Sequence, residues 1–388
     1  MKTINFVIFF TIVLAVYGLI NYYIFIRGWQ SIPSGAGART YYLILFLFFS
    51  LAFIAGRILE RFYLSLVSDI FVWIGSFWLA AMLYFFLIII ILDLSRLINH
   101  LVTIYPSFVT LDYARAKQTT LLFSIALVAV IILLGHINAL SPRIRTFDLT
   151  LPKNAGAKAG LNIVAASDIH LGTIIGRSRL DRLVKSMNEL KPDIVLLPGD
   201  IVDEDLGPVI RENLGEALRN IEAPLGVYAC TGNHEYIGGV EPACRYLVEH
   251  GIRVLRDSAV CIENSFYIVG REDREISGFA RKKRKTLEEL MLGVNQNLPV
   301  ILLDHQPFQL ARAAANGIDL QISGHTHHGQ LWPLNFITNA IYELSWGYKK
   351  IENTHFYISC GFGSWGPPVR VGNRPEIINF RLIFDSHK

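Results

Sequence analysis

The stretch "LNIVAASDIH" (residues 161–170) joins a run of apolar and small residues to an acid and an imidazole. The aliphatic residues at its start predict a short buried strand, and the polar pair follows where that strand ends. Asp168 and His170 stand two positions apart, so both side chains can reach one metal ion if the chain turns after the strand. The stretch therefore predicts an α/β domain with polar chemistry at its strand ends.

The same pattern recurs along the rest of the chain. The apolar runs that predict strands are "LNIVAAS", "DIVLLPG", "GVYACTG", "SFYIVG", "VILLDH", "DLQISG", "HFYISCG" and "IINFRLIF". Helical patterns lie between several of them, at residues 179–190, 209–221, 241–250 and 308–315. About 240 residues in this rhythm are enough to bury a core of their own.

Acids, imidazoles and one amide follow these runs directly. They are Asp168, His170, Asp200, Asn233, His234, Glu235, Asp304, His305, His325 and His327. Burying so many polar groups costs free energy unless a partner such as a metal ion offsets it. Carboxylate, imidazole and amide ligands without cysteine favour Mn, Fe, Zn or Mg. Even seven of these ten residues would be too many ligands for one tetrahedral ion, whereas seven fit two ions that share a carboxylate.

The order of these blocks carries a family resemblance. D-x-H, G-D, G-N-H-E, H and G-H-x-H resemble, over about residues 150–385, the calcineurin-like metallophosphoesterase superfamily. The tail "GFGSWGPPVRVGNRPEI" and the apolar N-terminal region are similar to a membrane-anchored branch of it. The implied fold is an N-terminal α-helical transmembrane bundle followed by an α/β metallophosphoesterase domain, a four-layer α-β-β-α sandwich, over residues 161–388.

The resemblance also implies a role for each polar residue. One divalent ion would be held by Asp168, His170 and His327, a second by Asn233, His305 and His325, and Asp200 would bridge them. His234 would be the catalytic histidine that protonates the leaving alkoxide. The nucleophile would be a hydroxide that bridges the metals, because water on a divalent ion loses a proton near neutral pH.

Four further residues have weaker assignments. Asp304 and Glu235 flank ligands and are expected to hold imidazoles in place, with solvated loop acids as the alternative. Arg370 in "PPVRVG" is predicted to bind a substrate phosphate, with an ordinary surface arginine as the alternative. His328 in "GHTHHGQ" stands where related sequences often have glycine, and it is expected either to touch the substrate or to face solvent.

The first 140 residues predict a membrane region. The chain is 52% hydrophobic with a mean hydropathy of +0.39, and the excess lies here. Apolar runs at residues 4–26, 41–59, 70–92 and 121–140 predict four transmembrane helices. The stretch "LSRLINHLVTIYPSF" predicts an interfacial helix, so five helices are the alternative count. Residues 141–160 are expected to form a linker and a first edge strand.

Charge adds little about orientation. Residues 1–150 contain ten Lys and Arg against five Asp and Glu, an excess that favours anionic lipid headgroups as partners and gives no sign of nucleic acid. The basic residues divide almost equally between the two membrane faces. We expect a multi-pass protein of the cell membrane with its catalytic domain in the cytoplasm.

The sequence thus predicts a membrane-bound hydrolase of phosphodiester or pyrophosphate bonds, acting on a phosphorylated, lipid-linked substrate. By resemblance, UDP-2,3-diacylglucosamine hydrolases of lipid A synthesis indicate one such substrate class. The alternatives are a phosphomonoesterase and a catalytically weak membrane sensor or binding protein. Transport is disfavoured because the spans lack a chain of intramembrane charges.

Overall fold

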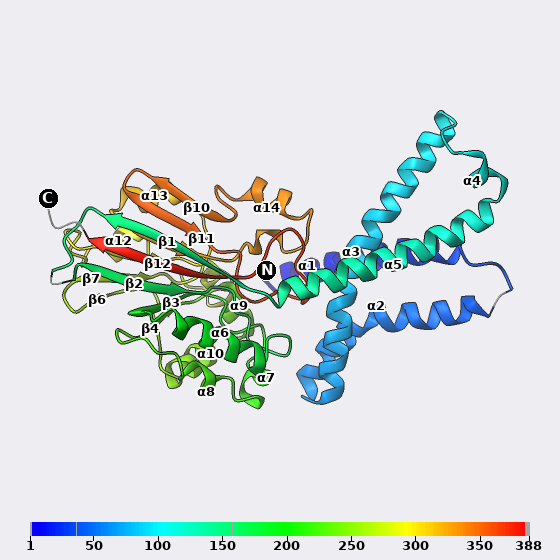
Figure 1. Ribbon diagram of the computed structural model, residues 1–388. Helices are drawn as coiled ribbons and strands as arrows, with labels where there is room; N and C mark the ends of the chain where they lie inside the picture. Colours follow the sequence, from blue (N-terminus) through cyan, green and yellow to red (C-terminus); the bar gives the residue numbers. More distant parts are fainter. Residues whose placement is uncertain (1, 36, 157, 385–388) are drawn as a thin grey trace. The chain divides into compact units, whose positions relative to one another are not determined.

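The computed structural model describes residues 2–35, 37–156 and 158–384. The chain divides into two compact units, one up to His136 and one from Ile137 onward (Figure 1). The first unit is helical, and the second combines strands with shorter helices.

The first unit contains long apolar helices. They are α1 (Lys2–Trp29), α2 (Ala38–Phe62), α3 (Leu66–Leu101) and α5 (Tyr113–Ala139), with the short α4 (Ser107–Leu111) before the last. Within the described residues, four helices are long and apolar enough to cross a membrane. The predicted N-terminal set of four apolar helices is therefore confirmed.

The structure differs from prediction after residue 92. The stretch expected to form a separate interfacial helix instead continues α3 as far as Leu101. Asp93 forms ion pairs with Arg96 of the same helix and with Arg27 of α1, so its carboxylate is paired at this point of the helix. Because no glycine or proline occurs between Gly75 and Pro106, the backbone has no reason to break earlier.

The second unit is built on two six-stranded sheets. The first has the order β1 (Arg143–Leu151), β12 (Glu376–Phe384), β2 (Gly160–Ala165), β3 (Ile194–Pro198), β4 (Val227–Cys230), β5 (Ile252–Val254). The second has the order β10 (Gly347–Ile351), β11 (Thr354–Ile358), β9 (Leu320–Ser323), β8 (Val300–Leu303), β7 (Phe266–Gly270), β6 (Ser258–Ile262). The central strands β2, β3 and β4 are mutually parallel, as are β7, β8 and β9.

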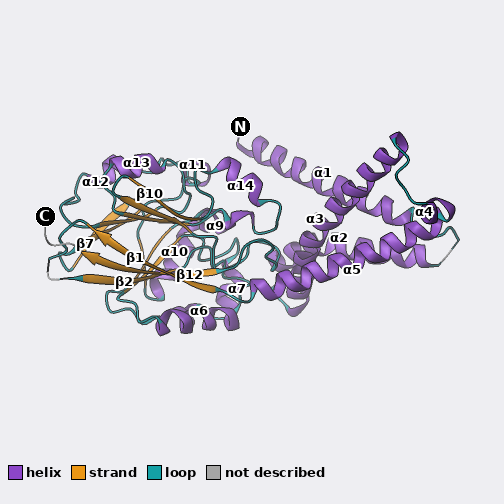
Figure 2. Ribbon diagram, turned by 45° about the horizontal axis from the view of Figure 1, so that its top comes forward, coloured by secondary structure: helices purple, strands orange, loops and turns teal. Residues whose placement is uncertain are grey.

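Helices cover the outer face of each sheet (Figure 2). The first sheet is covered by α6 (Arg177–Glu189), α7 (Leu206–Arg211), α8 (Gly215–Leu218) and α10 (Val240–Glu249), and the second by α12 (Leu287–Met291) and α13 (Leu310–Ala315). The remaining helices of this unit are α9 (Asn233–Gly238), α11 (Ile276–Phe279) and α14 (Asn335–Ile341). Successive strand residues face opposite cores: Ile163 of β2 lies in the core between the sheets, and Val164 lies in the core under α6, α8 and α10. A third core lies under α12 and α13. The predicted four-layer α-β-β-α sandwich is confirmed.

This topology brings the polar residues together. In parallel strands the carboxyl ends meet at one edge of the sheet, so the segments after β2, β3 and β4 are neighbours. The segments after β8 and β9 are neighbours in the second sheet for the same reason. The ring of His305, after β8, places its Nδ1 atom 2.8 Å from the carbonyl oxygen of Pro198, the last residue of β3, and so joins the two sheets at this edge.

Candidate metal centre

The polar residues leave their strands in a left-handed backbone conformation. The positive φ angles are 50° at Asp168, 52° at His170, 52° at Asp200, 72° at His325 and 45° at His327. Such angles are uncommon for residues other than glycine and cluster at functional sites. At Asp168 and His170 they supply the turn that the D-x-H spacing requires if both side chains are to face one ion.

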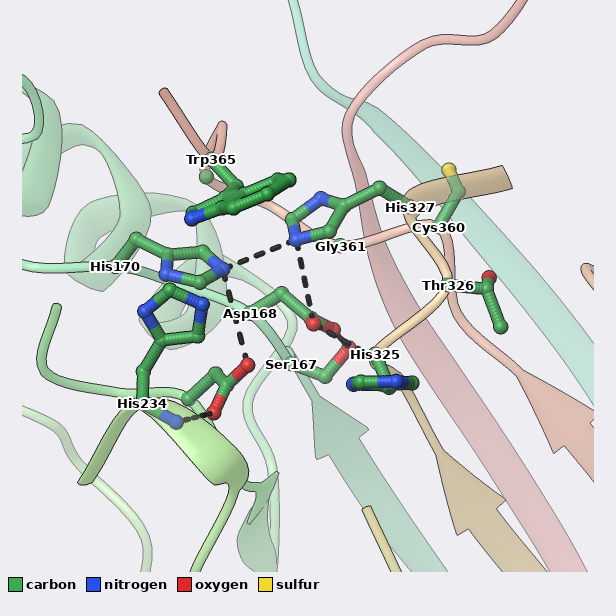
Figure 3. A network of polar contacts seen from close by, with 12 residues as sticks. Ser167, Asp168, His170, His234, His325, Thr326, His327, Cys360, Gly361 and Trp365 are labelled. Atoms are coloured by element: carbon green, nitrogen blue, oxygen red, sulfur yellow. Dashed lines mark hydrogen bonds and ion pairs between the residues drawn. The ribbon is translucent and has the colours of Figure 1, made fainter. Parts of the chain in front are cut away.

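One group of ligand atoms comes from Asp168, His170 and His327 (Figure 3). The Nε2 atoms of His170 and His327 are 3.0 Å apart, and Nε2 of His327 is 3.5 Å from Oδ1 of Asp168. All three side chains are buried. Ligands at about 2.0–2.1 Å from one small divalent ion lie roughly 3 Å from each other. The spacing of this group therefore fits a bound divalent ion.

A second group comes from Asp200, His305 and His325. Oδ2 of Asp200 is 2.9 Å from Nε2 of His305. The Nδ1 atom of His325 lies 2.7 Å from Oδ1 of Asn233, which adds an amide oxygen to the group. These residues are ligand types that divalent Mn, Fe, Zn or Mg accepts.

Asp200 lies between the two groups. Its Oδ2 atom, 2.9 Å from His305, is also 4.0 Å from Nε2 of His170 in the first group. Its Oδ1 atom accepts a hydrogen bond of 2.9 Å from the backbone nitrogen of His234, which fixes the carboxylate. The structure thus brings all seven predicted ligands together, while the ion that each one binds stays a prediction.

Burial and charge shift the pKa values of these residues in opposite directions. Burial lowers the pKa of His305, but the neighbouring Asp200 carboxylate outweighs it and holds this pKa well above its usual value. Burial and the nearby His305 lower the pKa of His325 to about 3. Burial raises the pKa of Asp168. Metal ligands must be deprotonated. A divalent ion bound here would therefore displace the proton that Asp200 otherwise holds on His305.

Asp203 is a site residue that the sequence prediction missed. Its Oδ1 atom is 3.0 Å from Nδ1 of His234 and 3.4 Å from Nδ1 of His170. Burial lowers the pKa of His234, but the Asp200 and Asp203 carboxylates outweigh it and raise this pKa to about 9. The available signal was the second acid in "PGDIVDE", three residues after Asp200.

The expectation that Glu235 and Asp304 hold imidazoles is wrong. The Glu235 carboxylate accepts hydrogen bonds from four backbone nitrogens, those of Asp200, Ile201, Val202 and Gly232. Asp304 forms ion pairs of 2.7 Å with Arg271 and 2.9 Å with Arg284. Both carboxylates therefore bind neighbouring loop segments. The His305 ring is oriented instead by the carbonyl oxygen of Pro198, and the rings of His170 and His234 by the carboxylate of Asp203.

Arg370 is fully buried beside the first ligand group. Its guanidinium donates to the carbonyl oxygens of Gly361 and Gly363 and to Oδ1 of Asn373. Asn373 in turn donates to the carbonyl oxygen of His327 at 2.8 Å. Arg370 therefore shapes the loop that supports a ligand, and its predicted contact with substrate stays a prediction.

His328 turns toward a different set of neighbours. Its Nδ1 atom lies 2.6 Å from the hydroxyl oxygen of Ser345, and its ring packs on Trp346 at 5.2 Å. The other two histidines of "GHTHHGQ" lie in the two candidate ligand groups, whereas this one contacts the segment after α14. Its predicted role in substrate binding stays a prediction.

Replacing His328 by glycine is expected to leave metal binding unchanged. The ring contacts Ser345 and Trp346, and its φ of +47° is one that glycine adopts without strain. Metal content of the purified variant, measured by plasma mass spectrometry, checks this. Loss of an ion would show that His328 belongs to the centre.

Replacing Gly324 by alanine is expected to disrupt the centre. A Cβ atom at this position would lie 2.1 Å from Oδ2 of Asp168, a ligand that cannot move without leaving its group. Metal content should fall, while Gly293→Ala, where a Cβ would meet nothing within 4 Å, should keep it. Equal metal content in both variants would contradict the placement of Asp168.

Comparison with known proteins agrees with this geometry. A family model described as calcineurin-like phosphoesterase matches residues 161–329. An uncharacterized metallophosphoesterase of Aquifex aeolicus is 34% identical over 230 residues, which cover 59% of this chain and 85% of that protein. The chain belongs to the calcineurin-like metallophosphoesterases.

Two relatives extend the similarity of this metallophosphoesterase into the membrane region. A transmembrane protein with metallophosphoesterase domain from Danio rerio is 34% identical over 282 residues, covering 69% of this chain and 63% of that protein. An uncharacterized metallophosphoesterase of Campylobacter jejuni is 29% identical over 385 residues, covering 97% and 98%. The chain thus spans less than two thirds of the Danio rerio protein. The four apolar helices and these relatives make it a membrane-associated metallophosphoesterase.

Proposed function

We propose that this metallophosphoesterase hydrolyses phosphodiester or pyrophosphate bonds with two divalent ions. The observation that supports it is a pair of candidate ligand groups, buried except for the half-buried His325, with the Asp200 carboxylate between them. The ligands would be Asp168, His170, Asp200, Asn233, His305, His325 and His327. Bound there, the ions would polarise phosphoryl oxygens and lower the pKa of water so that it attacks phosphorus.

His234 is proposed as the acid of the reaction. Asp203 occupies its Nδ1 atom, which leaves Nε2 to donate a proton to the leaving alkoxide. The neighbouring carboxylates raise the pKa of His234 to about 9, so the imidazolium form is present at neutral pH. A general acid must carry its proton at the working pH. The position of Asp203 thus supports this role.

The substrate is proposed to be phosphorylated and lipid-linked. The support is the membrane region, because a phosphoesterase held by four helices has ready access to esters in the same bilayer. A UDP-diacylglucosamine-type lipid is one such compound, with a pyrophosphate at the headgroup level. Phosphomonoester hydrolysis and a catalytically weak sensor are the alternatives.

Hydrolysis by the purified full chain tests this proposal. With Mn²⁺, bis(p-nitrophenyl) phosphate and a lipid-linked nucleotide pyrophosphate should be cleaved faster than p-nitrophenyl phosphate. Faster cleavage of the monoester would establish the phosphomonoesterase alternative. If metal binds and none of the three is cleaved, the sensor alternative holds.

The catalytic domain is proposed to lie in the cytoplasm, together with the N-terminus, since four spans place both on one side of the membrane. A green fluorescent protein fused after Lys388 should fluoresce, because it folds inside the cell. Activity of alkaline phosphatase fused at the same position would place the domain outside.

A further inference from the structure

An exposed apolar surface lies on the segment that follows the ligand His327. It consists of Trp332, Phe336, Ile337 and Ile341, which we call the α14 surface. Their exposed fractions are 50%, 63%, 55% and 58%, and among the described residues of α14 none is buried. Large apolar side chains gathered on ten residues are costly in water and mark a surface that contacts something apolar.

Hydrogen bonds join this surface to the end of α5. The backbone nitrogen of Trp332 donates to the carbonyl oxygen of Val371 at 2.8 Å. In the same loop, the carbonyl oxygens of Arg370 and Asn373 accept hydrogen bonds of 2.9 and 2.6 Å from the Asn138 side chain. The segment from 370 to 373 therefore bonds both to Trp332 and to the last turn of α5.

Further bonds fix the last turn of α5 within the catalytic domain. Arg179 donates to the carbonyl oxygen of Ala139 at 2.7 Å and to that of Phe362 at 3.1 Å. Arg374 donates to the carbonyl oxygen of Ser141 at 2.5 Å. These partners come from α6 and from the loops around the metal centre, so the residues from Ile137 onward at the end of α5 belong to the catalytic domain.

Asn138 lies at the end of α5, which is one of the helices long and apolar enough to cross a membrane. α5 has 27 residues, which span roughly 40 Å, more than the about 30 Å of the hydrocarbon core. Its last turn therefore lies near the interface between hydrocarbon and headgroups. Trp332 is bonded to the loop that this turn holds, and tryptophan with large aliphatic residues is typical of that interface.

We propose that the α14 surface inserts into the bilayer that holds this chain's own helices. The insertion would keep the metal centre at the headgroup level, because Asn373 in the shared loop also donates to the carbonyl oxygen of His327. Trp365 is exposed, packs on His234 at 6.0 Å and donates its backbone N–H to Gln330, two residues before Trp332, and it would face the headgroups. The contact with lipid does not require that any particular ester be cleaved.

Spin labelling of the full chain in nanodiscs with one chain per disc tests the insertion. A nitroxide at Phe336→Cys is compared with one at Leu292→Cys, which is 86% exposed. α12, which ends next to Leu292, and α14 lie at opposite ends of the domain in both views (Figures 1 and 2). The background carries Cys261→Ser, since the other three cysteines are buried. Accessibility to oxygen and to a water-soluble nickel chelate is measured for each label.

The label at position 336 should be accessible to oxygen and shielded from nickel, and the label at 292 should show the reverse. Equal exposure of both labels to nickel would overturn the proposal. The proposal would also be overturned if the label at 336 were shielded from nickel only in samples where chains associate, because a second copy of the chain would then cover the surface. Ile341→Cys provides a second position if Phe336→Cys fails to bind metal. No readout involves hydrolysis, so a failure here leaves the proposed activity standing.

Discussion

Replacing Asp200 by asparagine is expected to empty the metal centre and to abolish hydrolysis. The side chain keeps its shape but loses the charge that both ligand groups share, since Oδ2 lies 2.9 Å from His305 and 4.0 Å from His170. The loss of metal affinity should exceed the about 10- to 100-fold typical of residues that only support a ligand. Metal content after gel filtration and turnover of a diester are the two measurements.

Asp205→Asn is the matched control. Asp205 lies five residues further on and caps α7 by accepting a hydrogen bond from the backbone nitrogen of Gly207. Asparagine caps a helix about as well as aspartate, so this variant should retain metal and activity. If Asp200→Asn kept its metal and its turnover as well, Asp200 would not be the shared ligand.

Replacing His234 by alanine is expected to lower kcat by about 10²- to 10⁴-fold, the range typical of a lost general acid. Metal content should stay nearly intact, because the His234 side chain contacts Asp203 and packs against the His170 ring at 4.5 Å without completing either predicted ligand set. Turnover and metal content of the same preparation are compared with those of the parent.

Asp203→Asn sharpens this test. If Asp203 acts through His234, the double variant Asp203→Asn/His234→Ala should have the same kcat as His234→Ala alone, because the two residues act as one unit. His170, Asp203 and His234 also offer atoms close enough for an ion. Loss of an ion in His234→Ala would therefore identify His234 as a ligand and contradict its role as the acid.

The strands and the ligands were predictable because their signal is local. β3, β4, β7, β8 and β9 formed within the apolar runs that predicted them, and β2, β11 and β12 begin one residue before theirs. Central strands buried on both faces read as continuous apolar sequence. β5, β6 and β10 escaped prediction because they are short, lie at or near sheet edges and include exposed positions. The ligands follow strands directly, so a prediction of the strands also placed them.

Contacts between distant loops were not predictable. Asp203 meets His234 only because the loops after β3 and β4 are neighbours, and no local pattern encodes that contact. Asp304 finds Arg271 and Arg284 in the same way. The helix expected at residues 209–221 breaks into α7 and α8 at Asn213, where φ is +50°, a local conformation that the helical pattern concealed.

Manganese binding to the purified full chain, followed by electron paramagnetic resonance, tests the central claim most directly. Two ions per chain are predicted, with a spectrum in which they are magnetically coupled, because the Asp200 carboxylate lies between the ligand groups. A single uncoupled ion per chain at saturation would contradict a two-metal centre.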